Sequence, residues 1–201
     1  MPDVKKRATQ LTGTKSLDER HLVDNFSPGN IEQNGTGGRV DGAEITASLP
    51  FDLLTDYLSG FGANASLSDT DSTIAIPGTV ASIPLTNVTL PGLSRIVWQA
   101  TVYFEKYGFS ARIATRYRSN YIGEITDYAG DRALEYVRHE QLTDFQTGYD
   151  FQQGPLHGLS LVFQIDNMTN TPFIDYAGIT TRVRDYETYG RVFFFGAKYK
   201  L

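Results

Sequence analysis

The chain has 201 residues, with 18 basic and 23 acidic side chains and a net charge of −5, so it lacks the basic surplus of a nucleic-acid-binding protein and we expect no nucleic acid partner. It contains no cysteine, which excludes disulfides and thiolate metal sites. No run of about 18 apolar residues occurs, which excludes a transmembrane helix.

The first 39 residues are rich in Gly, Asn, Asp, Thr and Lys and show no sustained periodicity. This composition predicts a long loop or a disordered arm. The segment is charged but lacks the apolar stretch of a secretory signal. We therefore expect an outer loop or arm at 1–39 and a β-rich domain at 40–201, in a protein that either stays in the cytoplasm or is part of a longer chain.

From residue 40 onward, apolar and polar side chains alternate with a period of two, which indicates β-strands with two unlike faces. The strand at 109–121 is the most regular and places Arg112, Arg116 and Arg118 on one face. Three arginines on one face need water or carboxylates, because a dry core would leave their charges unpaired. In all, we predict about seven strands, at 40–49, 61–69, 94–105, 109–121, 140–152, 159–168 and 191–201.

The connections between these strands alternate between short and long. The short ones are 50–57, 106–108 and 153–158; the long ones are 70–93, with a possible hairpin at 74–76, 122–139 and 169–189. Most predicted strands have about ten residues, whereas strands of soluble sheets have a mode near 5–6. Membrane strands need about 9–11 residues, and outer-membrane barrels have short periplasmic turns and long extracellular loops. Strand length and unequal turns therefore favour an antiparallel transmembrane β-barrel segment.

In a membrane barrel the more apolar face contacts lipid. On the terminal strand this face comprises Phe193, Phe195, Ala197, Tyr199 and Leu201. Aromatic side chains near other strand ends fit girdles at the membrane surfaces; they are Trp98, Phe104, Phe109, Tyr117, Tyr149 and Phe151. The opposite face would line a wet lumen with Glu105, Arg112, Arg116, Arg118, Asp144, Asp150, Asp166, Lys198 and Lys200.

Two groups of side chains are candidates for ligand contacts. The arginine row on 109–121 is explained either by solvation and cross-strand ion pairs, or by contact with an anionic ligand or the acidic surface of a plug. In the long connections, aromatic and charged side chains suit stacking on sugars or chelates, with ordinary solvated loops as the alternative. These loop residues are Tyr121, Asp127, Tyr128, Asp131, Tyr176, Arg182, Arg184 and Tyr186.

No catalytic, metal or cofactor site is predicted, and we expect the protein not to be an enzyme. His21, His139 and His157 lie in different connections without metal-binding spacing. No GxSxG nucleophile motif occurs, and the glycines at 35–38 lack the lysine of a P-loop.

Four motifs occur in order along residues 38–201: G-x-E at 42–44, GFS at 108–110, N-x-T-N at 167–170 and YGR at 189–191. We expect the first asparagine of N-x-T-N, Asn167, to bond the backbone where a strand becomes a loop. With their surroundings, GRVDGAEITA, LSGFGANASLSDTDS, GFSARIATRYRSNYIG, LSLVFQIDNMTNTPF and YGRVFFFGAKYKL, these segments resemble the C-terminal barrel of TonB-dependent outer-membrane receptors.

The resemblance implies the last seven strands of a 22-stranded barrel occluded by an N-terminal plug, with fifteen strands (22 − 7) supplied elsewhere. It implies a receptor in the outer membrane of a Gram-negative bacterium that imports a bulky nutrient, a ferric siderophore or an oligosaccharide. The implied partners are outer-membrane lipid, the remaining barrel and plug, the TonB complex acting through the plug, and the barrel-assembly machinery acting through the terminal strand. The family usually ends on an aromatic residue, whereas this sequence ends on Leu201, and nothing in it matches a plug or a TonB box.

Two other hypotheses stay open. Bacterial barrels have an even number of strands, so a small stand-alone barrel would need an eighth strand from residues 1–39 or self-association, and would act as a passive pore or structural protein. A soluble β-sandwich would show the same alternation of side chains, and would serve as a binding module with its apolar face packed against a second sheet.

Overall fold

Twelve β-strands make up almost all of the regular structure of the described residues. The computed structural model describes residues 37–78, 84–128 and 131–200. They form two antiparallel sheets and two short 3-10 helices, η1 (Phe51–Leu53) and η2 (Asp56–Leu58). The all-β, antiparallel fold predicted from the sequence is confirmed. None of the described helices is long or apolar enough to cross a membrane.

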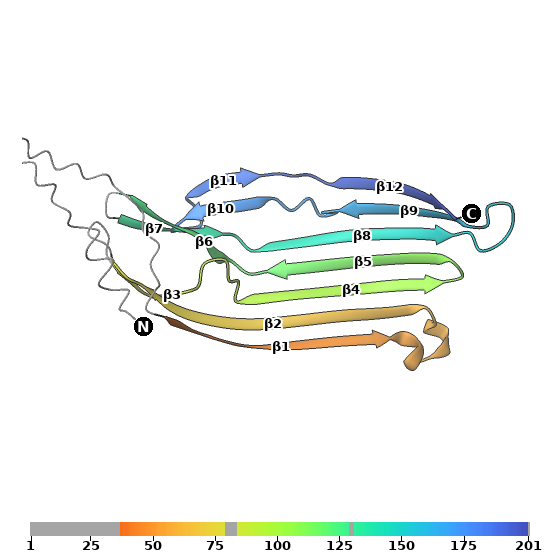
Figure 1. Ribbon diagram of the computed structural model, residues 1–201, viewed down its shortest axis with the longest axis horizontal. Coiled ribbons are helices and arrows are strands. Elements are labelled where there is room, and N and C mark those ends of the chain that lie inside the picture. Colours follow the sequence, from red (N-terminus) through yellow and green to blue (C-terminus); the bar gives the residue numbers. More distant parts are fainter. Residues whose placement is uncertain (1–36, 79–83, 129–130, 201) are drawn as a thin grey trace, which may run out of the picture. The chain divides into compact units, whose positions relative to one another are not determined.

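The larger sheet, here called the long sheet, contains seven strands that lie side by side in chain order (Figure 1). They are β1 (Gly38–Pro50), β2 (Phe61–Ile76), β4 (Ile96–Lys106), β5 (Phe109–Arg118), β8 (Glu140–Asp150), β9 (Leu159–Asp166) and β12 (Val192–Tyr199). Each is antiparallel to the next, and the short strand β3 (Leu85–Val88) pairs with the end of β2. The short connections lie at one end of this sheet and the long connections at the other (Figure 1).

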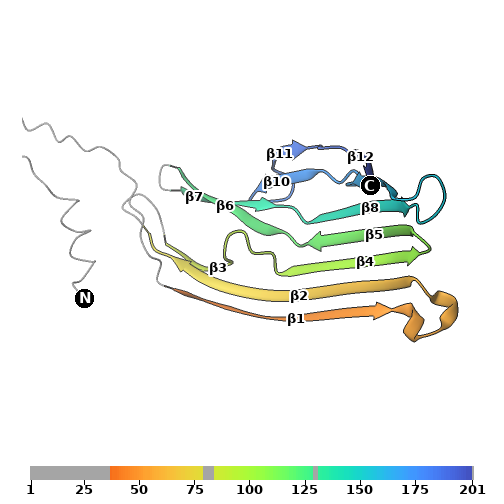
Figure 2. The same ribbon diagram turned by 45° about the vertical axis from the view of Figure 1, so that its right-hand side comes forward.

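Four short strands from two of the long connections form a second sheet, here called the loop sheet. Their order is β11 (Val183–Glu187), β10 (Phe173–Ala177), β7 (Asp131–Val137) and β6 (Tyr121–Tyr128). Figure 2 shows these strands grouped at the end of the long sheet that carries the long connections. The pairing of β7 with β10 joins the two connections to each other.

The prediction of about seven strands is too low, because the long connections contain β3, β6, β7, β10 and β11. These strands have four to eight residues. A segment such as VRDYE at 183–187 has charged side chains on both faces and is too short to show a period. The seven predicted strands correspond to the seven strands that follow chain order in the long sheet.

Several predicted boundaries also differ from the structure. Residues 1–36 of the predicted arm lie outside the described residues. Gly38 and Arg39, at its end, belong to β1. Strand β2 continues past residue 69 to Ile76, because its polar end pairs with the start of β1, with Gly38 opposite Ile74. The segment 74–76 is the end of β2 and pairs antiparallel with β3, the next strand, with Ile74 opposite Val88 and Ile76 opposite Leu85. The possible hairpin at 74–76 is therefore present, with the end of β2 as its first strand.

The long sheet has no apolar core of its own. Among the described residues, the buried apolar side chains are Val88, Ile122, Ile174 and Tyr176, and all four lie in long connections. Large apolar side chains of the outer strands are instead open, with exposed fractions of 68% for Ile45 and 75% for Phe195. A sheet whose seven strands in chain order bury no large apolar side chain, among the described residues, lacks the hydrophobic stabilisation that holds a soluble domain together.

The GFS motif marks the tightest turn of the long sheet. Tyr107 and Gly108 both have positive φ, 55° and 81°, as the two-residue hairpin turns of antiparallel strands require. A Cβ on Gly108 would lie 2.4 Å from the carbonyl oxygen of Asp150 on the neighbouring hairpin. Glycine is therefore required here both for its backbone conformation and for the close approach of β8.

The N-x-T-N motif ties three segments together at the other end of the sheet. The side-chain oxygen of Asn167 accepts a hydrogen bond from Thr171 N at 2.8 Å, and its nitrogen donates to the carbonyl oxygens of Thr171 (3.1 Å) and Gly190 (3.3 Å). Its backbone N–H donates to Asp144 Oδ1 on β8 at 2.9 Å. The expectation that Asn167 bonds the backbone where β9 becomes a loop is confirmed.

Candidate functional site

One face of the long sheet is apolar across all seven strands and is here called the apolar face. The pairing register places one uninterrupted row of apolar side chains across its middle: Leu49, Ala63, Val102, Ile113, Phe145, Ile165 and Phe193. On β12, Phe193, Phe195, Ala197 and Tyr199 all belong to this face, opposite Ile165, Phe163, Leu161 and Leu159 of β9. Leu201 lies outside the described residues. An apolar surface this wide is unusual for a soluble monomer and needs an apolar partner or medium.

Aromatic side chains gather at both ends of the apolar face. At the long-connection end, the rings of Trp98 and Tyr117 stack with 5.7 Å between centroids. At the short-turn end, Phe104 lies 4.5 Å from Phe61 and 6.0 Å from Phe109, measured between ring centroids. The middle row between these groups is mainly aliphatic. Near β4 and β5 the aromatic side chains thus lie toward the strand ends, as expected from the sequence, whereas Phe145 and Phe193 lie in the middle row.

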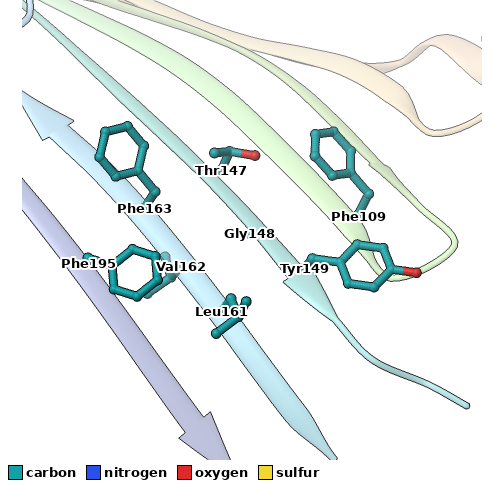
Figure 3. Close-up of a pocket in the computed structure, with 8 residues that line it drawn as sticks. All are labelled: Phe109, Thr147, Gly148, Tyr149, Leu161, Val162, Phe163 and Phe195. Carbon is teal, nitrogen blue, oxygen red and sulfur yellow. The ribbon is translucent and has the colours of Figure 1, made fainter. Parts of the chain in front are cut away.

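A shallow depression of about 180 Å³ interrupts the apolar face near its short-turn end. Figure 3 shows the small side chain of Thr147 between the rings of Phe109 and Phe163, with Leu161, Tyr149 and Phe195 around it. Thr147 turns its hydroxyl to the backbone, since Oγ1 donates to the carbonyl oxygen of Ser110 at 2.9 Å. The depression therefore presents almost only carbon atoms.

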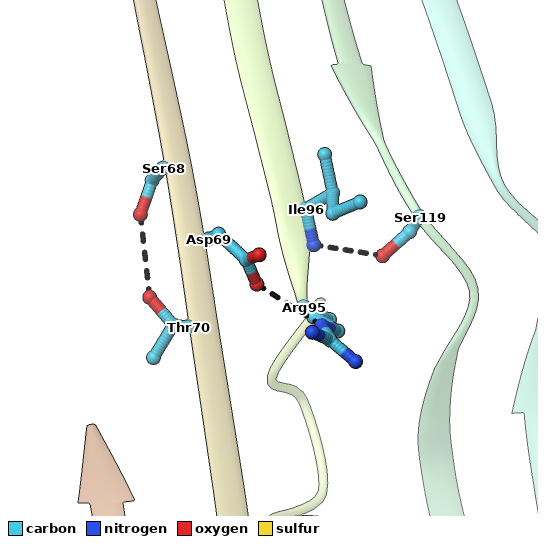
Figure 4. A network of polar contacts seen from close by, with 6 residues as sticks. All are labelled: Ser68, Asp69, Thr70, Arg95, Ile96 and Ser119. Atoms are coloured by element: carbon cyan, nitrogen blue, oxygen red, sulfur yellow. Dashed lines mark hydrogen bonds and ion pairs between the residues drawn. The ribbon is translucent and has the colours of Figure 1, made fainter. Parts of the chain in front are cut away.

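Charged side chains limit the apolar face at both ends. At the long-connection end, Asp69 follows Leu67 on this face and pairs with Arg95, with 3.0 Å between Oδ1 and Nε (Figure 4). Ser119 Oγ accepts a hydrogen bond from Ile96 N at 3.0 Å in the same region (Figure 4). At the short-turn end, β4 ends with Lys106, whose Nζ lies 5.2 Å from the ring centroid of Tyr107. The apolar surface is thus a band with polar edges.

The opposite face of the long sheet, here called the polar face, carries the predicted arginine row. Arg116 pairs with Asp144 on β8, with 3.3 Å between Nη1 and Oδ2, and Asp144 also accepts the bond from Asn167 described above. Arg112 lies between Tyr103 and Gln146 in the register, and no carboxylate of the described residues pairs with it. The arginine row is therefore only partly explained by cross-strand ion pairs.

Arg118, the third arginine of the row, is held at the long-connection end of the sheet. Its Nε donates to Ser94 Oγ at 3.1 Å and its Nη2 to the carbonyl oxygen of Gly92 at 3.1 Å. The guanidinium lies 3.8 Å from the ring centroid of Tyr121. Arg118 and Tyr121, both predicted as ligand contacts, thus contact each other and fix the strand ends.

The predicted loop residues separate into buried and exposed ones. Tyr176 on β10 is 5% exposed and its ring stacks on Tyr136 of β7, with 5.6 Å between centroids. Burial raises the pKa of the Tyr176 hydroxyl above its ordinary value. Arg184 on β11 forms an ion pair with Glu135 of β7, which is 7% exposed. Tyr176 and Arg184, both predicted to contact a ligand, therefore contact other residues of the loop sheet and stabilise it.

The remaining predicted residues lie at the surface of the loop sheet. Arg182 lines an open cleft of about 340 Å³ together with Arg132, Leu134 and Tyr136, and Tyr186 on β11 is exposed. The side chains of Asp127, Tyr128 and Asp131 lie outside the described part of the structure. The structure therefore brings Arg182 to a cleft but does not collect the predicted loop residues in one site.

Sequence reasoning missed the residues that organise the long connections. Glu135 and Ser94 are buried polar side chains, and each bonds one of the predicted arginines. Neither stands out in the sequence, because Glu135 lies in the short strand β7 and Ser94 in an irregular segment. Their partners come from 49 and 24 residues away in the chain (184 − 135 and 118 − 94), a separation that no local pattern reveals.

The chain was also compared with known proteins. No family model, no curated protein and no solved structure matches it.

Proposed function

We propose that the chain forms part of an outer-membrane β-barrel, with the apolar face toward lipid and the polar face toward the lumen. The observation that carries this proposal is the apolar face itself, which crosses seven strands and is covered by no other part of the described structure. A soluble β-sandwich would bury this face under a second sheet about 10 Å away. Exposed fractions of 61% for Phe193 and 68% for Ile45 argue against such a sandwich.

The height of the apolar band supports the same proposal. On strand β4 the apolar band runs from Ile96 to Phe104, eight steps (104 − 96) or about 27 Å at a rise of about 3.4 Å per residue. A strand tilt of about 40° reduces this length to a height of about 21 Å, comparable with the ~25 Å apolar band of outer-membrane barrels. Long loops at one end and short turns at the other are a further feature of these barrels.

Strand direction limits how the sheet is completed. In the described residues β1 and β12 are the two edge strands of the long sheet, and each pairs with one neighbouring strand. Six antiparallel pairings separate them, so β1 and β12 run in the same direction. Direct pairing of β12 with β1, in one chain or between copies with the same membrane orientation, would be parallel. A fully antiparallel barrel needs an odd number of added strands, which argues against closure by self-association.

We infer further that the added strands and this chain make up a TonB-dependent receptor, in which the chain forms the C-terminal part of the barrel. Fifteen added strands satisfy the odd number, and so does one, which would give a small stand-alone barrel with a structural or passive pore function. The receptor is favoured because the motifs that resemble the family occupy structural positions: Gly108 in the hairpin turn and Asn167 at the strand end. Such a receptor imports a ferric siderophore or an oligosaccharide with energy from TonB.

Fractionation tests the proposal. An antibody against this chain should detect it in outer membranes that have been washed with carbonate, in a band that shifts when the sample is boiled before electrophoresis. A band several times heavier than 22.3 kDa is expected for the receptor, and a heat-modifiable band near that mass would indicate the small barrel. Recovery in the soluble fraction without detergent would overturn both.

The single tryptophan of these 201 residues offers a second test, in a protein whose other tryptophans, where it has them, are replaced by phenylalanine. Trp98 lies on the apolar face near the long-connection end, so its fluorescence should be strongly quenched by lipids brominated near the head group. Tryptophan placed at Thr101, on the polar face of the same strand in a Trp98→Phe background, should be much less quenched. Equal quenching at both positions would contradict the assignment of the faces.

A further inference from the structure

The depression in the apolar face differs from its surroundings in shape and in chemistry. Its floor is the small side chain of Thr147, which lies opposite Ala111 on β5 and Phe163 on β9. Larger side chains stand around it, among them Phe109, Tyr149 and Leu161 (Figure 3). The only hydroxyl at its floor is already bonded to the backbone. A depression with mainly carbon-lined walls and a floor hydroxyl that is already bonded suits a hydrocarbon chain.

A cation lies on the same face near this depression, on β4, two strands away from the floor residue Thr147 on β8. Lys106 lies directly opposite Phe109 in the register, and Phe109 in turn lies opposite Tyr149. The ammonium group of Lys106 contacts the ring of Tyr107, and no carboxylate of the described residues forms an ion pair with it. A positive charge at the edge of an apolar surface complements the phosphate group of a phospholipid.

We propose that the depression seats one acyl chain of a phospholipid of the leaflet at the short-turn end, with Lys106 binding its phosphate group. This inference rests on the proposed membrane function, since it places the apolar face in lipid, and adds a specific lipid site to that face. Thr147 determines the depth of the depression, because a larger side chain there would fill it. Lys106 selects phospholipids over lipids that lack a phosphate.

Matched variants of the full protein test the seat. Thr147→Leu fills the depression and removes one hydrogen bond. Thr115→Leu is its control, because Thr115 lies on the same face, is also half-buried and also makes one hydrogen bond, to Thr143 Oγ1 at 3.1 Å, but does not line the depression. Lys106→Gln removes the cation, and Lys198→Gln is its control on the polar face near the same end of the sheet.

The measurement is native mass spectrometry of the protein extracted in its native assembly from outer membranes and titrated with dioleoylphosphatidylglycerol or phosphate-free dioleoylglycerol. Thr147→Leu should weaken the binding of both lipids about tenfold, because it removes apolar contact with the acyl chain. Thr115→Leu should change the binding of neither lipid. Lys106→Gln should weaken only the binding of the phospholipid, by about fivefold. Lys198→Gln should leave the binding of both lipids unchanged. Equal binding by wild type and Thr147→Leu, or equal loss with Thr115→Leu, would overturn the proposal.

Quenching of Trp98 separates failure of the seat from failure of the membrane function. If brominated lipid quenches Trp98 while Thr147→Leu binds lipid like the wild type, the apolar face contacts lipid but has no specific seat. If Trp98 is not quenched and the protein is soluble without detergent, the seat and the membrane function both fail.

Discussion

The long sheet leaves large apolar side chains exposed on its apolar face, whereas the loop sheet buries several of its own. In the loop sheet, Ile122, Ile174 and Tyr176 are buried, although Val183 and Tyr186 on β11 are exposed, and an ion pair joins Arg184 to the buried Glu135. In the long sheet, the described buried residues include Ser72 and Thr143, which are polar, and apart from Val88 on the short strand β3 no large apolar side chain. Both regions are antiparallel sheets, but they differ in whether their large apolar side chains are exposed or buried.

This difference indicates that the two sheets depend on different surroundings. The loop sheet gains stability from ordinary burial and hydrogen bonding, which water supports. The long sheet gains little from burial within the described chain, and in the proposed barrel lipid would stabilise its apolar face and further strands its free edges. Substitutions in one sheet should therefore change different properties from substitutions in the other.

The largest effect is expected for a charge in the middle of the apolar face. We predict that Val102→Arg destabilises the assembled protein by about 2–4 kcal/mol, as arginine does at the midplane of outer-membrane barrels. Thr101→Arg, one residue away on the polar face, should cost less than about 1 kcal/mol because its side chain would face water. The measurements are the urea midpoint in lipid vesicles and the amount of heat-modifiable protein in outer membranes. Equal effects of the two substitutions would show that the faces have been assigned wrongly.

A smaller effect is expected at the end of the long sheet. Asn167→Gly keeps the left-handed backbone conformation, with φ of 51°, but removes the side-chain bonds to Thr171 and Gly190. We predict a loss of about 2 kcal/mol, since each of the three lost bonds contributes roughly 0.5–1 kcal/mol. Asn170→Gly is the control, because Asn170 also has positive φ but no side-chain bond of this kind is described for it. The urea midpoint in lipid measures both, and an equal decrease would mean that the backbone, rather than the side chain, matters at Asn167.

The long sheet could be predicted from the sequence because its period-two pattern is strong and local. In β5, apolar and polar side chains alternate through ten residues, and the pairing register follows from keeping one face apolar. The motif residues Gly108 and Asn167 could also be located, since their conformations favour these residue types. Boundaries were less accurate where polar strand ends, such as residues 70–76 of β2, are held by pairing alone.

The loop sheet could not be predicted, because its strands are short and its contacts are distant. Residues 173–177 carry the buried Ile174 and Tyr176, a pattern of only two positions. The sequence predicts Tyr176 and Arg184 as ligand-binding loop residues. In the structure Tyr176 stacks on Tyr136 and Arg184 pairs with Glu135, so both form contacts within the loop sheet. Exposure of a loop side chain depends on which distant segment packs against it, and composition carries no information on that.

The ion pair of the loop sheet provides a test that leaves the long sheet unchanged. Arg184→Ala leaves the buried carboxylate of Glu135 without its partner. We predict a local loss of about 1 kcal/mol, less than the 3–5 kcal/mol of fully buried pairs because the Arg184 side chain is half exposed. Faster hydrogen exchange of β7, β10 and β11 should reveal it, with no change in the heat-modifiable band. The control is Arg39→Ala, whose pair with Asp41 is exposed on both sides and should contribute almost nothing.

The smallest effect is expected from the titration of Tyr176 at high pH. Burial, with a smaller contribution from Tyr136, raises the pKa of Tyr176 in the folded loop sheet, while Arg138 lowers it less. The neutral hydroxyl is therefore favoured by folding, and this stabilisation is present below the unfolded value of about 10 and is lost as the pH rises through the folded pKa. Above pH of about 10, hydrogen exchange of β10, corrected for its intrinsic pH dependence, should accelerate by less than about tenfold. Tyr176→Phe keeps the stacking ring but cannot titrate, so it should remove this acceleration, and a wild-type pH response in that variant would assign the effect to another group.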